Sequence, residues 1–479
     1  MQNSKLLKIL RQLNDAERTQ LKKFVRSPYF NESKAVTTLV EFVLPLLHEK
    51  EEEKLAKEKL FTHLYPHNEY KEGKVNDLMK ITLELVEKFI QVHTQNLPEF
   101  RLDTEIFAQI RLTQFYLSRQ NEKMALATLK NVQQLHEKSD YRNNQFFYRQ
   151  FLIEEYLGKL PAMDEAQHES LDLQRIIDNV QLFYLLTQLE YYCHIASQQH
   201  IINTNYDIDF FDDILAYIAK NAKIQHIPAL NIYYHTACML RYPLQRSHFE
   251  QAYQLIQQYA QLFPITEKKN LYRILRNYCA KRSGRYFEEQ LWDLYRISLE
   301  SSLLYDEWEY IPAITFESIV ILSLRLKKVD WVVNFLENYH PYLPQKAENE
   351  HYQYCRAKLY FAQKNYTHIV KILNSMDTKS SLSKIKKRRL LLQTYFELAK
   401  ENQKEQYIYE ELLDLNLKSF VKFLNDKKTI STHYKEANKN FAYCLRKILT
   451  QTPHSELQRI IQQIKPLMEK DWLLEKAEG

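Results

Sequence analysis

The sequence predicts an all-α protein, and three observations favour that class. Only four glycines occur in 479 residues, whereas average usage is about 7%. Glycine supplies the positive-φ positions of tight hairpin turns, so its shortage disfavours sheet-rich folds. Apolar residues recur at three- and four-residue spacing along most of the chain, which is typical of amphipathic helices, and no segment forms a convincing strand. The codon bias of a low-GC genome would also lower the glycine content, but the structural consequence is the same.

Residues 1–98 are predicted to form a helical N-terminal domain. Leu6, Leu7 and Leu10 lie on one face of a first helix. Asn14 or Asp15 is expected to cap a second helix, since such side chains accept hydrogen bonds from free helix amides. Further helices are expected over 36–47, 55–64 and 75–92, and Pro98 marks the end of the domain.

Helical segments of similar length follow one another beyond Pro98. Turn residues separate them, so neighbouring segments are expected to pack as antiparallel pairs. The expected helices cover residues 106–119, 123–137, 141–158, 171–197, 210–222, 227–240, 248–263, 268–283, 286–304, 314–326, 331–339, 350–363, 366–376, 384–400, 407–423, 433–449 and 457–472.

One stretch carries the pattern of a known helical repeat. Ala357, with Tyr360 three residues later, precedes a polar turn, and Tyr366 is followed by Ile369 and Leu373. This spacing resembles the tetratricopeptide-repeat family, and the resemblance extends in degenerate form over about residues 101–410. It implies a right-handed superhelical stack of antiparallel helix pairs, a TPR-like α-solenoid. The expected domains are therefore 1–98, the solenoid over 99–425 and a helical tail or cap over 426–479.

Composition narrows the class of protein. The five cysteines lie tens of residues apart, which favours free thiols in a reducing compartment. No signal peptide and no apolar stretch of about 20 residues is recognised, so we expect a cytoplasmic protein without membrane insertion. No catalytic or cofactor-binding motif occurs, so we expect no enzyme activity and no cofactor.

The best candidate for a metal site is an acidic cluster at Asp207, Asp209, Asp212 and Asp213. Carboxylates at this spacing are suitable ligands for magnesium or calcium. The favoured interpretation is structural: Asp209 caps a helix that begins at residue 210, and the next two aspartates favour its first turn. We therefore predict no metal.

Basic residues are concentrated near the C-terminal end. Residues 371–450 contain 17 Lys and Arg against 9 Asp and Glu, and the densest run is Lys384, Lys386, Lys387, Arg388 and Arg389. Such a run can contact phosphates, whereas the ordinary interpretation is a solvated helix start. An anionic partner, nucleic acid included, is the alternative.

The resemblance implies that the first helix of each pair faces a concave surface. Near-register positions on that surface are Arg241, Arg282, Tyr354, Lys358 and Phe361. The predicted function is a protein–protein interaction scaffold, adaptor or regulator that holds a peptide or partner segment in this groove, with Arg and Lys selecting acidic partners. The alternative is a nucleic-acid-associated regulator that uses the basic region 371–450.

Overall fold

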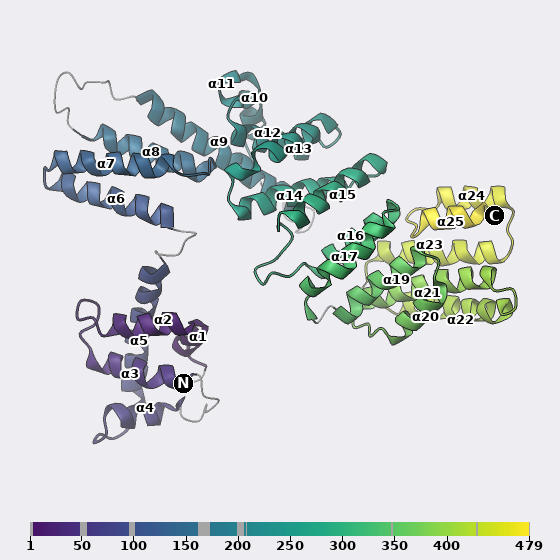
Figure 1. Cartoon of the computed structure of the whole chain (residues 1–479), viewed down its shortest axis with the longest axis horizontal. Helices are drawn as coiled ribbons and strands as arrows, with labels where there is room; N and C mark the ends of the chain where they lie inside the picture. Colours follow the sequence, from purple (N-terminus) through teal and green to yellow (C-terminus); the bar gives the residue numbers. More distant parts are fainter. Residues whose placement is uncertain are drawn as a thin grey trace. The chain divides into compact units, whose positions relative to one another are not determined.

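The predicted all-α class is confirmed for the described part of the chain, which forms 24 α-helices and no strand (Figure 1). The chain divides into two compact units, Met1–Thr187 and Gln188–Gly479, and helix α9 (Leu173–Gln198) crosses the division. The computed structural model describes residues 3–47, 55–94, 101–160, 173–198, 206, 208–345, 348–427 and 430–478.

The first unit begins with five helices that enclose one apolar cluster. The cluster takes buried leucines and valines from every one of these helices, including Leu7, Val40 and Val86. Asn14 caps the second helix as expected: its side-chain oxygen accepts from the Glu17 amide, and the Glu17 carboxylate accepts from the Asn14 amide. The helices of this unit before α9 are α1 Lys5–Gln12, α2 Asp15–Val25, α3 Lys34–Leu46, α4 Lys57–Leu64, α5 Glu72–Thr94, α6 Arg101–Ser118, α7 Glu122–Glu137 and α8 Asn144–Gly158.

The second unit continues from α9 to the C-terminal end. Consecutive helices pack against each other, as α12 does on α13, α14 on α15 and α21 on α22. Its elements after α9 are α10 Phe211–Lys220, α11 Ala222–Gln225, α12 Pro228–Arg241, α13 Arg246–Tyr259, η3 Ala260–Leu262, α14 Ile265–Ala280, α15 Arg285–Glu300, α16 Ala313–Arg325, α17 Val329–Tyr339, η4 His340–Tyr342, η5 Glu348–Tyr352, α19 Gln353–Ala362, α20 Tyr366–Ser375, α21 Ser381–Glu401, α22 Gln406–Asp426, α23 Thr432–Leu449, α24 His454–Gln463 and α25 Lys470–Ala477.

Five of the described helices end in a left-handed turn whose positive-φ residue is not glycine. At Lys364 (φ 59°) the amide donates to the Phe361 carbonyl over 3.1 Å, and the Asn365 amide donates to the Tyr360 carbonyl over 2.9 Å. This pair of bonds satisfies two carbonyls at the end of α19. The same two bonds recur at four further residues with positive φ, namely Gln120, Ser302, Lys327 and Gln451.

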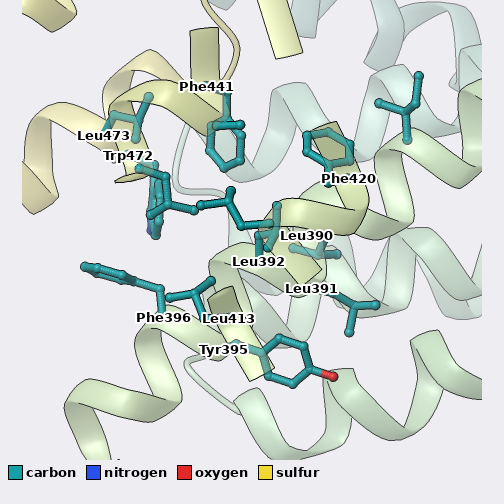
Figure 2. Close-up of a cluster of buried hydrophobic side chains, with 14 of the residues drawn as sticks. Leu390, Leu391, Leu392, Tyr395, Phe396, Leu413, Phe420, Phe441, Trp472 and Leu473 are labelled. Carbon is teal, nitrogen blue, oxygen red and sulfur yellow. The ribbon is translucent and has the colours of Figure 1, made fainter. Parts of the chain in front are cut away.

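The last helices share one core. Buried side chains of α21 and α22 meet those of α23 and α25 in a single cluster, which Figure 2 shows around Leu390, Phe420, Phe441 and Trp472. This cluster includes residues on both sides of position 425. The predicted domain boundaries at 98 and 425 remain predictions.

Two expectations on local structure are wrong. Helix α10 begins at Phe211 and is preceded by Phe210 without a side-chain cap, so Asp209 does not cap it; Asp207 lies outside the described residues. Helix α21 begins at Ser381, capped by the Ser380 hydroxyl, so the basic run follows the first turn instead of opening the helix. Within the described residues, no helix has both the length and the apolar character needed to cross a membrane.

The turn at Lys364 predicts an unusual order of stability. A side chain in the left-handed region costs about 1–2 kcal/mol, so Lys364→Gly should be more stable than Lys364→Ala by about 1 kcal/mol. Urea unfolding of the two full-length variants measures the difference. Lys371, exposed within α20, is the matched control, where alanine should be the more stable by about 1 kcal/mol. If alanine is the more stable substitution at both Lys364 and Lys371, the left-handed turn at Lys364 is wrong.

Candidate functional site

One face of α21 is polar although it lies inside the protein. Lys386, Arg389, Gln393 and Glu397 follow one another at three- or four-residue spacing, which places them on one side of the helix. Arg389, Gln393 and Glu397 are each less than 10% exposed, and Lys386 is half-buried. We call these four residues the α21 polar face. Buried charges are costly unless they are paired, so the partners of this face decide what it does.

The first partner is Glu317 of α16, a carboxylate that is 4% exposed. Lys386 Nζ donates to Glu317 Oε2, and His351 Nδ1 lies 2.6 Å from Glu317 Oε1. Burial alone would raise the pKa of Glu317. The bonds from His351 and Lys386 outweigh burial and lower the pKa below its ordinary value.

The second partner is Glu469, which directly precedes α25. Its Oε1 atom lies 3.0 Å from Arg389 Nε and 3.4 Å from Lys358 Nζ. Burial would raise the pKa of this carboxyl, but the two cations lower it to about 2. Arg389 also donates from Nη1 to Asn438 Oδ1 over 2.8 Å, which connects α21 to α23.

The last residue of the α21 polar face is Glu397, whose carboxylate contacts two side chains of α25. Glu397 Oε1 accepts from Trp472 Nε1 over 2.8 Å and pairs with Lys476 Nζ over 2.8 Å. The α21 polar face therefore contacts Glu469, which precedes α25, and Trp472 and Lys476 within α25.

The basic run of the sequence is largely occupied within the chain. Lys387 Nζ donates to the Met376 carbonyl over 3.0 Å, and Arg388 Nη1 donates to Ser419 Oγ over 2.9 Å, with its guanidinium 4.7 Å from the Phe423 ring centre. The expectation of a solvated helix start is thus wrong for Lys386, Lys387, Arg388 and Arg389, which are half-buried or buried. In this run, only the Lys384 side chain has no hydrogen-bond or ion-pair partner among the described residues. Binding of an anionic partner by the run stays a prediction.

The five predicted groove residues lie in two separate places. Tyr354 and Lys358 on α19 lie beside the α21 polar face. Tyr354 is buried in the apolar cluster, and this burial raises the pKa of its hydroxyl. Phe361 packs against the same cluster. Arg241 forms two hydrogen bonds with Asp212, of 3.1 and 2.7 Å. Arg282 donates to the Pro243 carbonyl over 2.8 Å and stacks on the Tyr278 ring. Partner binding by these side chains stays a prediction.

An exposed loop between α15 and α16 was missed from the sequence. We call residues 301–312 the aromatic loop; it carries Trp308, 74% exposed, and Ile314 in the first turn of α16 is equally exposed. Asp306 Oδ1 accepts from the amides of Trp308 and Tyr310, both over 2.9 Å, and the Asp306 amide donates to the Tyr310 carbonyl over 2.8 Å. The turn that carries the indole is therefore fixed by its own hydrogen bonds.

The aromatic loop is also fastened to its neighbours. The Ile311 amide donates to the Tyr342 carbonyl over 2.8 Å, and Lys269 Nζ donates to the Tyr305 carbonyl over 2.7 Å. Glu307 and Glu309 flank the indole, and neither carboxylate has a partner within the described part of the chain. The sequence signal was present as two aromatic residues in an acidic connection, Asp306 to Tyr310.

A pocket of 640 Å³ lies beside the C-terminal half of α21. Its walls come from α21, α22, α25 and the turn from α23 to α24, and they combine apolar side chains such as Phe396 and Leu457 with Lys400 and Lys476. Lys400 is exposed, lies 5.0 Å from the Phe396 ring centre and has no carboxylate partner among the residues that the structure describes. Those residues also contain no group of three or more metal-ligating side chains.

Comparisons of the chain with protein-family models, with curated proteins and with solved structures found no match. The resemblance to tetratricopeptide repeats therefore stays an expectation.

The Glu469 node predicts a loss of stability when its carboxylate is removed. Glu469→Gln leaves Arg389 and Lys358 buried without their carboxylate, so the free energy of unfolding should fall by about 3–5 kcal/mol at neutral pH. Urea unfolding measures this loss, with Asp471→Asn at an exposed position in the first turn of α25 as the control. A change no larger than that of the control would contradict the role of Glu469.

The same node predicts a dependence on pH. Because the folded-state pKa of Glu469 is depressed from 4.5 to about 2, its stabilisation is present above pH 4.5 and is lost as the pH falls towards 2. The wild type should therefore lose more stability over this interval than Glu469→Gln does. If the free energy of unfolding falls equally with pH in both proteins, Glu469 does not pair with Arg389 and Lys358.

Proposed function

We propose that this chain is a protein–protein interaction scaffold or adaptor and that the aromatic loop is its binding surface. The observation that carries the proposal is the exposed indole of Trp308 on a turn held by internal hydrogen bonds. Tryptophan provides a large contact area and is enriched among the residues that dominate binding energy. A turn ordered before binding loses little conformational entropy when a partner docks.

The predicted architecture forms part of this proposal. Packing of consecutive helices and the recurring turn geometry support a right-handed stack of antiparallel helix pairs. Five buried cysteines without disulfides fit the reducing cytoplasm that we expected. We place binding at the aromatic loop and not at the five groove residues, because those side chains already make contacts inside the chain.

No observation favours the nucleic-acid alternative as a second proposal. Four of the five residues in its basic run make contacts within the chain.

The proposal predicts that capture of partners depends on one side chain. Full-length wild type, Trp308→Ala and Tyr29→Ala are each used for affinity purification from the native host at near-physiological salt, and captured proteins are quantified by mass spectrometry. Tyr29 is 86% exposed in the first unit and serves as the matched aromatic control. The captured amount of a stoichiometric partner should fall by about tenfold or more with Trp308→Ala and should not change with Tyr29→Ala. Equal capture by all three proteins would refute the proposed surface.

A further inference from the structure

Two histidines face each other across the helix pair α12 and α13. The Nδ1 atoms of His235 on α12 and His248 on α13 lie 3.0 Å apart. Both residues are half-buried, so solvent still reaches them. Neither imidazole has another hydrogen-bond or ion-pair partner among the described residues. The pair therefore brings together two nitrogen atoms that no carboxylate or backbone carbonyl already occupies.

The separation of the two nitrogens matches the spacing of neighbouring ligands around a transition-metal ion. Imidazole nitrogens bind such ions at about 2.0–2.1 Å, so two of them at 90° to each other lie about 2.8–3.0 Å apart. Divalent copper and nickel adopt this 90° arrangement, whereas tetrahedral zinc requires about 3.3–3.4 Å between ligands. The 3.0 Å between His235 Nδ1 and His248 Nδ1 thus fits the 90° arrangement without movement of either helix.

The two helices hold both rings in place before an ion binds. α12 and α13 are consecutive helices that pack against each other and are joined by residues 242–245. The Tyr234 ring makes edge contacts with both imidazoles, at 5.1 Å from the His235 ring centre and 6.2 Å from that of His248. Ligands that are already positioned lose little conformational entropy when the ion binds.

We propose that His235 and His248 form a binding site for a divalent copper or nickel ion, with water in the remaining coordination positions. In the free chain, the Nδ1–H of one ring donates to Nδ1 of the other. When the ion binds, that proton moves to Nε2 of its own ring, and both Nδ1 lone pairs coordinate the ion. This site departs from the sequence prediction of no metal, and it goes beyond the function proposed for the aromatic loop.

The test titrates the full-length chain, purified without a histidine tag, with Ni²⁺ at pH 8, where imidazole with an ordinary pKa of about 6.5 is neutral. Calorimetry should show one ion per chain. His235→Phe and His248→Phe keep a ring and remove its nitrogens, so each should weaken binding by about tenfold or more. His433→Phe, at an exposed position of α23, is the matched control and should bind as the wild type does. Mg²⁺, which prefers oxygen ligands, should not bind.

Urea unfolding separates loss of the site from loss of the fold. Ni²⁺ should raise the urea midpoint of the wild type and of His433→Phe, because an ion that binds the folded chain stabilises it. The midpoints of His235→Phe and His248→Phe should not change with Ni²⁺, and circular dichroism checks that both variants fold. A wild type that does not bind Ni²⁺ overturns the inference, as does binding that neither variant weakens.

Discussion

The second unit depends on the pairing of buried charges along α21. A helix that places a lysine, an arginine and a glutamate inside the protein is stable only if opposite charges meet them. Glu317 supplies that charge from α16, Glu469 supplies it from the start of α25, and Lys476 meets Glu397. These pairs fasten segments that are 69 to 80 residues apart in the chain. Ion pairs and the apolar cluster therefore both hold the C-terminal helix α25 against its neighbours.

Because of this internal pairing, few charges of the basic run are available to bind other molecules. The cations of the basic run are largely used inside the fold, whereas the carboxylates that flank Trp308 are unpaired within the described residues. The exposed aromatic surface is therefore acidic, although the chain carries a formal net charge of +6. A partner of the aromatic loop is expected to be basic at its rim, the opposite of the acidic partner that the sequence indicated.

Local patterns in the sequence predicted much of the fold. Apolar spacing located most helices, and the Asn14 cap could be predicted because a cap and its amide are three residues apart. The left-handed turns were not predicted, since Lys364 and Lys327 are not residues that favour this conformation. The candidate site was predicted least: Lys358 and Glu469 are 111 residues apart, and no spacing rule brings them together. The basic run looked solvated because its acidic partners lie outside it in the sequence.

The most direct measurement of the central claim is the reactivity of individual lysines towards an amine-acylating reagent, resolved by mass spectrometry. We predict that Lys358 and Lys386, whose side chains are 14% and 26% exposed and paired with carboxylates, react more slowly than exposed Lys400 by about tenfold or more in the folded chain. In urea the three should react alike. Equal reactivity in the folded chain would contradict the buried charge pairing, because it would place Lys358 of α19 and Lys386 of the α21 polar face in solvent.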